Sequence, residues 1–424
     1  MRLIRIVTLL AAASFGVASL AARAESTPAT QAAVATIEYK ELSWTRGTMS
    51  PRSKPPFRAD HVGSLLRPKT LLAAREQHAH DEISTAELKQ REDDAIRAAV
   101  KMQEEVGLKV ATDGEFRRAM WHTDFLSRFV NVDVVPGKIK VRFQSFEGET
   151  ELEPPGTVVT GKLGWPVGGI FVEHFEFLAS AVSSRVTPKI TIPSPSTMHF
   201  RGGRAAIDRH AYPDMGEFYA DLARVYAQEV HAFTKAGCRY LQIDEVNFAF
   251  LCDPKLRDEV RTTIGEDPDR LPHTYANLIN SSIAACTADT VVCLHLCRGN
   301  AMSSWLAQGG YEPVAEVLFN EVAVDGYFLE FDTPRAGTFE PLRFVPKGKT
   351  VVLGLVTTKL GTMESKEDLK RRIDEAARYC PLEQLALSPQ CGFASGAPGN
   401  KISLDDELRK LRLVVETARE VWGE

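Results

Sequence analysis

The sequence predicts an α/β fold of the (β/α)8 TIM-barrel class, and two features of the chain support this prediction. Short apolar runs, each ending in polar or charged residues, recur eight times from residue 57 onward. Most of the intervals between them carry apolar residues at helical spacing. Strands that alternate with helices form parallel sheets, and eight such units close a barrel. The pattern alone leaves an open, doubly wound sheet as the alternative, although no dinucleotide-binding glycine motif follows the first strand.

The elements follow one another in a regular order. The predicted strands occupy residues 57–64, 108–115, 189–196, 239–245, 291–297, 327–332, 351–356 and 385–391. Two helices are clear: residues 84–106 begin with Ser84 and Glu87 in capping-box spacing, and residues 214–236 stop before Gly237. Weaker helical patterns cover residues 271–288, 301–320, 366–379 and 404–422.

Residues 130–186 fit no strand–helix unit. They contain the alternating stretch IKVRFQSFEGETELE, with several Gly and Pro residues around it. Alternation with a period of two is typical of half-buried strands, and Gly and Pro are typical of turns. We therefore predict an insertion after the second strand, in the form of a hairpin or lid. Trp121, His122, Phe125 and Phe129 precede it and either cover the mouth of the barrel or simply pack.

The first residues have the features of a secretory signal peptide. Arg2 and Arg5 precede an uncharged run, which ends at a small-residue cleavage sequence before Glu25. The run is short for a bilayer span, so no stable membrane span is expected. We predict a signal peptide at 1–24, a flexible linker at 25–56 and a single barrel domain at 57–424. This organisation predicts an exported, periplasmic protein; the alternative is a cytoplasmic protein whose synthesis starts at Met49.

Composition and charge exclude several classes of protein. Hydrophobic residues make up 44% and charged residues 25% of the chain, as in ordinary globular proteins. The net charge of −5 offers no basic footprint for nucleic acid. Seven cysteines in a chain of this length do not form a disulfide framework. The expected partners are therefore small molecules, and the oligomeric state is left open.

Polar side chains gather at the ends of the predicted strands, where the active site of such a barrel lies. These residues are Ser64, Asp113, Glu115, Asp244, Glu245, His295, Cys297, Glu330, Asp332 and Cys391.

Three of these residues suggest a zinc site. His295 and Cys297 are two apart on a strand and so share a face. Cys391 lies where a strand stops at a turn, between Pro and Gly. With a carboxylate, either Glu330 or Asp332, they could surround one Zn²⁺ tetrahedrally. The alternatives are a core cysteine beside a hydrogen-bonded histidine, and carboxylates paired with a nearby arginine, Arg335.

The remaining carboxylates have two possible uses. Asp113 and Glu115 lie in TDGEF, and Asp244 and Glu245 in IDE, with no compensating base on their own strands. They could hold the ammonium group of an amino acid, or they could be ion-paired residues of the barrel.

The motifs HVGSLLRP, DGEF, YLQIDE, LHLC, LEFD and SPQCG occur in this order from about residue 57 to the C-terminus. In this respect the chain resembles the catalytic C-terminal half of cobalamin-independent methionine synthase, and most closely its short single-barrel relatives. The resemblance implies a barrel with zinc held by His, Cys, Glu and Cys. It also implies transfer of a methyl group from 5-methyltetrahydrofolate to the thiol of homocysteine, giving methionine.

Matched motif by motif, the resemblance implies zinc ligation by His295, Cys297 and Cys391, with Glu330 preferred to Asp332 as the carboxylate. It also implies that Ser64, Glu115 and Asp244 hold the amino and carboxylate groups of homocysteine.

Three departures from the family matter. The large enzymes carry a duplicated N-terminal half, which is absent here. This departure and the next concern the methyl donor, and the third concerns protonation of the leaving group. The family's folate-stacking Trp after the third strand is absent, since the place reads Ile-Pro-Ser-Pro. At the family's catalytic His, the nearest match is Lys359, so Lys359 or His61 could serve as the acid. A related donor, such as an epoxide or a corrinoid-linked group acting on another thiol, is therefore one alternative function. A non-catalytic, exported zinc- or thiol-binding protein is the other.

Overall fold

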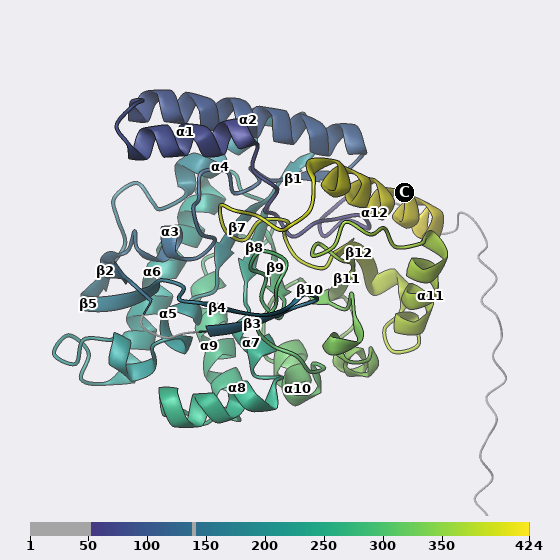
Figure 1. Cartoon of the computed structure of the whole chain (residues 1–424). Coiled ribbons are helices and arrows are strands. Elements are labelled where there is room, and N and C mark those ends of the chain that lie inside the picture. Colours follow the sequence, from purple (N-terminus) through teal and green to yellow (C-terminus); the bar gives the residue numbers. More distant parts are fainter. Residues whose placement is uncertain (1–51, 138–140, 424) are drawn as a thin grey trace, which may run out of the picture. The chain divides into compact units, whose positions relative to one another are not determined.

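The computed structural model describes residues 52–137 and 141–423 (Figure 1), and its main feature is a six-stranded parallel sheet. Each strand pairs with the next one along the chain, in the order β12-β11-β10-β9-β8-β7. The strands are β7 (Ile190–Pro193), β8 (Tyr240–Asp244), β9 (Val291–Leu296), β10 (Gly326–Glu330), β11 (Thr350–Val356) and β12 (Leu385–Pro389). All six overlap the predicted strands, which confirms an α/β fold with a parallel sheet. The predicted signal peptide and most of the predicted linker lie outside the described residues.

Further pairings extend from both ends of this sheet. β1 (Val110–Ala111) runs parallel to β6 (Thr187–Pro188), which leads through Lys189 into β7. At the other end, Ala59 forms a parallel bridge with Leu387 of β12. The Thr112 hydroxyl donates a hydrogen bond to the Gly63 carbonyl, 2.6 Å away, and so links the two ends. Closure of the whole series into a barrel stays a prediction.

The predicted first strand, 57–64, forms only this single bridge. The Asp60 carboxylate accepts the N–H of Phe57 at 3.2 Å and the N–H of His61 at 2.8 Å. Side-chain bonds of this kind offer the backbone an alternative to a sheet ladder. The segment therefore runs beside β12 as an extended but irregular chain.

The helices lie mostly where the sequence predicts them. The Ser84–Glu87 capping box is present at the start of α2, and Gly107 ends that helix in the left-handed conformation. Predicted helix 301–320 is shorter, because its first part forms a tight turn between Ala301 and Ser304. The helices are α1 (Lys69–Ala79), α2 (Thr85–Val106), α3 (Thr123–Leu126), α4 (Val172–Ala181), α5 (Thr197–Phe200), α6 (Met215–Lys235), α7 (Asn247–Phe250), α8 (Pro254–Glu259), α9 (Leu271–Ile283), α10 (Glu312–Asn320), α11 (Lys366–Ala377) and α12 (Leu404–Trp422).

The region predicted as an insertion contains two antiparallel ribbons. β2 (Val130–Val135) pairs with β5 (Gly156–Gly164), and β3 (Val141–Ser145) pairs with β4 (Gly148–Leu152). The same range also contains α4, which was not predicted, and β6 follows directly after its end. α4 buries Phe175 and Leu178 completely, so this part belongs to the packed domain.

Two layers of buried side chains hold the sheet. Helix α6 buries one face, including Phe218, Leu222 and Tyr226, against the sheet. A second cluster gathers side chains from five neighbouring strands, among them Tyr240 and Phe328. Within the described ranges, none of the helices combines the length and apolarity that crossing a bilayer requires.

Candidate metal centre

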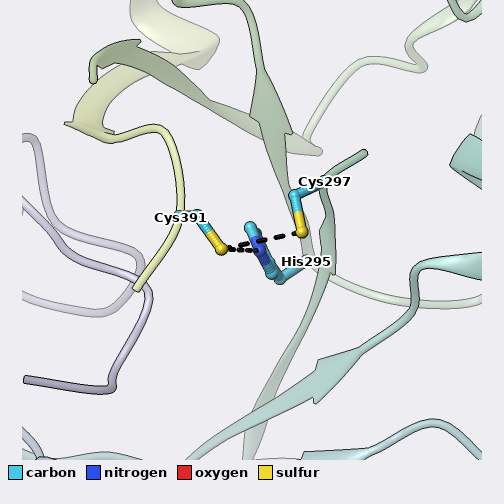
Figure 2. A group of neighbouring side chains, drawn as sticks. All are labelled: His295, Cys297 and Cys391. Atoms are coloured by element: carbon cyan, nitrogen blue, oxygen red, sulfur yellow. Dashed lines mark hydrogen bonds between the residues drawn. The ribbon is translucent and has the colours of Figure 1, made fainter. Parts of the chain in front are cut away.

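The structure brings together His295, Cys297 and Cys391, as Figure 2 shows. His295 lies on β9, Cys297 follows the last residue of that strand, and Cys391 follows the end of β12. The Cys391 Sγ lies 3.6 Å from the Cys297 Sγ and 3.7 Å from the His295 Nε2. All three side chains are buried. The predicted metal-binding trio therefore converges on one point between two strand ends.

These distances fit a tetrahedral zinc ion. An ion with bonds of about 2.3 Å to sulfur and about 2.0 Å to nitrogen holds its ligand atoms roughly 3.5–3.8 Å apart. The two distances between these ligand atoms, 3.6 and 3.7 Å, fall in that interval. Two thiols and an imidazole are also ligands that zinc prefers. The residues present therefore fit a zinc site with three protein ligands.

Close packing fixes the position of Cys391. A side chain at Gly392 would meet the Ser64 Oγ at 1.9 Å, so only glycine lets this loop approach the segment after residue 57. The Asn300 side-chain amide donates to the Gly392 carbonyl at 2.8 Å. The N–H of Gln390 donates to the Val356 carbonyl at 2.7 Å. The thiol is therefore held by the fold rather than by a mobile loop.

The electrostatics of the group favour a cation. The hydrogen-bonded contact with Cys391, together with burial, raises the pKa of the Cys297 thiol well above its ordinary value. Burial lowers the pKa of the His295 imidazole, but its contact with the Cys297 sulfur and the nearby carboxylate of Asp244 outweigh this and raise the pKa overall. Three buried ligand atoms thus sit where positive charge is stabilised.

The two candidate carboxylates lie beside the trio but not in it. Among the described residues, the group of ligand atoms within 4.8 Å of one another contains neither Glu330 nor Asp332. Arg335 lies 2.6 Å from the Glu330 Oε1 and 3.1 Å from the Asp332 Oδ1. The alternative weighed in the sequence, an ion pair with Arg335, is the arrangement observed.

The other oxygen of Glu330 is also occupied. It accepts the N–H of Arg298 at 2.8 Å and the side-chain amide of Gln390 at 2.9 Å. Burial raises the pKa of Glu330, but Arg335 and Lys359 offset this and lower it to about 2. Burial and the charge of Glu330 raise the pKa of Asp332. Glu330 is therefore the anion that balances the arginine.

A cavity of about 320 Å³ opens from the trio. Its lining includes all three ligands together with Ser64, Glu115 and Asp244. Asp244 is deeply placed, and burial, helped by the charge of Glu115, raises its pKa to about 7. The cavity thus combines two sulfur atoms with the three residues that the resemblance assigns to an amino acid.

Glu115 is held in an unusual way. Its backbone has a φ of 60°, which a non-glycine residue rarely adopts. One carboxylate oxygen accepts the Thr191 hydroxyl at 2.8 Å and lies 3.3 Å from the Arg118 guanidinium. The other, Oε2, is buried and has no hydrogen-bond partner in the described part of the chain. That oxygen is available to a ligand.

The structure places the other predicted residues away from the cavity lining. Asp113 accepts the N–H of Glu115 at 2.9 Å. Glu245 accepts the N–H of Asn247 at 2.7 Å and the hydroxyl of Ser196. Both carboxylates therefore bond to backbone N–H or hydroxyl groups, which is not the ion pairing weighed in the sequence, and the Oδ2 atom of Asp113 is buried without a hydrogen-bond partner in the described residues.

The two candidate acids differ in position. Lys359 Nζ donates to the side-chain oxygen of Gln390 at 3.1 Å and lies 3.5 Å from that of Asn300, which lines the cavity. His61 is fully buried, and burial, then the charge of Lys189, lowers its pKa well below the ordinary value. Lys359 therefore does not line the cavity itself but contacts Asn300, which does. His61 is not among the residues that line the cavity.

The sequence analysis missed several residues of the cavity. Arg201 lines it from the end of α5, and Phe143 and Leu152 line it from the β3–β4 ribbon. Arg201 is an isolated arginine before two glycines, which carries no motif. The sequence predicts the ribbon residues as strands, but it does not predict that the ribbon folds against the cavity.

Comparison with known proteins places the chain in a family. A profile described as "Cobalamin-independent synthase, Catalytic domain" matches residues 173–419. The chain is 43% identical to the uncharacterised protein YxjH of Bacillus subtilis over 87% of this chain and 96% of that protein. It is 26% identical to a methionine synthase of Saccharolobus solfataricus over 78% of this chain and 86% of that protein.

Solved structures agree with this. A Listeria monocytogenes protein described as the "Putative Vitamin-B12 Independent Methionine Synthase" superposes with a TM-score of 0.69 and 37% identity. The superposition covers 89% of this chain and 100% of that one. The chain therefore belongs to the cobalamin-independent methionine synthase family, and residues 173–419 of its α/β domain match that family's catalytic domain.

Proposed function

We propose that this protein is a zinc-dependent methyltransferase that transfers a methyl group to the thiol of homocysteine and gives methionine. The observation that carries the proposal is the convergence of His295, Cys297 and Cys391 at tetrahedral spacing on the wall of a cavity. Family membership supports methyl transfer in general. The donor in the proposal is 5-methyltetrahydrofolate or a related compound.

His295, Cys297 and Cys391 are the residues that would hold the zinc. Three protein ligands leave one tetrahedral position, as in other catalytic zinc sites. When bound, zinc lowers the pKa of a coordinated thiol and so supplies a thiolate at neutral pH. Glu330 and Asp332 pair with Arg335 and are not needed as ligands in this proposal.

Three residues would orient the amino acid. The unpartnered oxygen of Glu115 and the carboxyl of Asp244 suit an ammonium group. The Ser64 hydroxyl, which already lies 3.4 Å from the N–H of Ala394, suits a carboxylate. Fixing both groups of homocysteine places its thiol toward the sulfur ligands, and positioning of this kind accounts for a large part of a transfer rate.

Lys359 is the proposed acid for the leaving group. Its ammonium lies 3.5 Å from the Asn300 side-chain oxygen, and Asn300 lines the cavity. His61 is the weaker candidate because it is buried and outside the lining.

We also infer that the sheet closes into a barrel, since Ala59, Gly63 and Thr112 link its two ends.

The experiment is a methyl-transfer assay on zinc-loaded protein, with homocysteine and either 5-methyltetrahydrofolate, its triglutamate or methylcobalamin. Methionine should form with at least one donor. Cys391→Ser should lose this activity, whereas Cys286→Ser, which changes a cysteine outside the cavity, should keep it. Methionine from none of the donors, with fully zinc-loaded and folded protein, would overturn homocysteine methylation and favour another thiol.

We further propose that the chain is exported and cleaved before Glu25. The support is the basic start, the apolar run and the cleavage sequence. The mass of the protein recovered from its native host tests this. A mature chain beginning at Glu25 is the expected result, and a chain beginning at Met49 would contradict export.

A further inference from the structure

Arg201 is the cation of the cavity that lacks a partner. It lies directly after α5 and lines the same cavity as the metal-binding trio. Its Nη1 is buried without a hydrogen-bond partner, and over residues 52–137 and 141–423 no ion pair involves this side chain. Other buried arginines differ: Arg118 lies 3.3 Å from Glu115, and Arg298 donates to the carbonyl of Gly309.

A guanidinium nitrogen that is buried without a partner is costly. The Nη1 atom of Arg201 is such an atom, although the side chain as a whole is half-buried. Burial lowers the pKa of Arg201 to about 10, which still leaves the side chain charged at neutral pH. No carboxylate contributes to this shift, although Glu115 and Asp244 line the same cavity. The charge of Arg201 is therefore not balanced by the acids of the amino-acid site.

The fold holds Arg201 rigidly. All four residues of α5 are buried, and the His199 ring bonds to the Tyr275 hydroxyl at 2.9 Å. A side chain at Gly203 would meet Ile264 at 2.8 Å, so the turn after Arg201 packs closely. A guanidinium on such a support is preorganised, as the planar fork of arginine requires for binding a carboxylate or phosphate.

His122 adds a second group on the same wall. It is buried, its Nδ1 has no hydrogen-bond partner in the described residues, and it lines the cavity. Burial, then the charge of Arg201, lowers the pKa of His122 well below its ordinary value. The two side chains are thus close enough to interact, and the neutral imidazole has an N–H to donate.

We propose that Arg201 and His122 form an anion subsite that binds a carboxylate or phosphate group of the methyl-donating substrate. This inference rests on the proposed function. The amino-acid substrate already has an acidic pair for its ammonium and Ser64 for its carboxylate. Arg201 lies outside ion-pair distance of those acids, so its ligand is the second substrate. The subsite would therefore select donors that carry an anionic group.

The first test measures binding without turnover. Thermal unfolding of the full, metal-free chain is followed while glutarate or inorganic phosphate is added. At least one anion should raise the unfolding temperature of the parent saturably, and Arg201→Met should abolish this response. Arg142→Met, which changes an exposed arginine of the β3–β4 ribbon, controls for salt effects. Equal responses of the parent and Arg201→Met to both anions would overturn the subsite.

The second test assigns the anion to a substrate. In Arg201→Met, the KM for the methyl donor should rise about 10- to 100-fold, the loss expected for hydrogen bonds to a charged group. The KM for homocysteine should stay within about twofold. A rise in the homocysteine KM with the donor KM unchanged would contradict the assignment to the donor. Anion binding that depends on Arg201 in a protein that methylates no homocysteine would instead refute only the proposed function.

Discussion

At the scale of single residues, the position of Glu330 decides how many ligands the protein offers to a metal. Glu330 and Asp332 share Arg335, at 2.6 and 3.1 Å, and neither joins the three ligand atoms. We therefore predict that Glu330→Gln and Asp332→Asn each still bind one zinc per chain, measured by elemental mass spectrometry. A folded variant that loses zinc would identify its carboxylate as a fourth ligand.

Glu407 is a buried acid outside the cavity lining, and it gives a pH prediction. Burial raises its pKa to about 8, although the N–H of Leu66 donates to it at 2.7 Å. Between the ordinary value of 4.5 and about 8, the folded state keeps a proton that the unfolded state has released. The free energy of unfolding should therefore fall as pH rises through this range, by an amount on the order of a few kcal/mol.

Glu407→Gln should remove this fall, because an amide keeps the acceptor and does not ionise. Urea unfolding at pH 5 and pH 8 measures the effect, with Glu416→Gln as the control on the same helix. The pH difference should shrink in Glu407→Gln and persist in Glu416→Gln. An unchanged pH difference in Glu407→Gln would show that this carboxyl ionises freely in the folded protein.

At the scale of elements, the β3–β4 ribbon forms part of the cavity wall. Its main chain is bonded to the segment after β9: Gln144 N–H donates to the Trp305 carbonyl at 2.7 Å, and the Trp305 N–H donates back at 2.8 Å. Phe146 and the Trp305 ring also pack edge to face. A few contacts, centred on Trp305, thus attach the ribbon to the rest of the domain.

Gln144→Pro should loosen this attachment, because proline cannot donate the first of these bonds. One such bond contributes about 0.5–1.5 kcal/mol net, so the ribbon should open more often while the sheet stays folded. Hydrogen exchange of the amides of β3 and β4 should quicken, and those of β9 should not. Gln144→Ala, which keeps both main-chain bonds, is the control. Equal exchange in both variants would show that the bonds do not hold the ribbon.

At the scale of the whole molecule, prediction from sequence succeeded where one strong signal dominated. Strands β7 to β12 are apolar runs with polar ends. The apolar residues predict buried strands, and the polar residues predict where these strands end. The segment 57–64 was predicted as a strand, but the Asp60 side chain takes the backbone N–H groups that a ladder needs. Helix α4 was missed because its sequence, VEHFEFLASA, lies among residues with strand and turn signals.

The candidate site follows the same logic. His295 and Cys297 are two residues apart on one strand, so the sequence predicted that their side chains lie on the same face. The position of Cys391 could be predicted because it directly follows another strand. The role of Glu330 did not follow, because Arg335 is near both carboxylates in sequence and only side-chain geometry separates an ion pair from a ligand. Arg201 carries no signal at all, since its significance lies in the absence of a partner within the described residues.

The zinc content per chain of protein purified without chelator should be measured first, for the parent, Cys391→Ser and Cys286→Ser. We expect one zinc per chain in the parent and in Cys286→Ser, and a sharp loss in Cys391→Ser. A folded parent that contains no zinc and takes up none when zinc is added would contradict the central claim that His295, Cys297 and Cys391 form a metal centre.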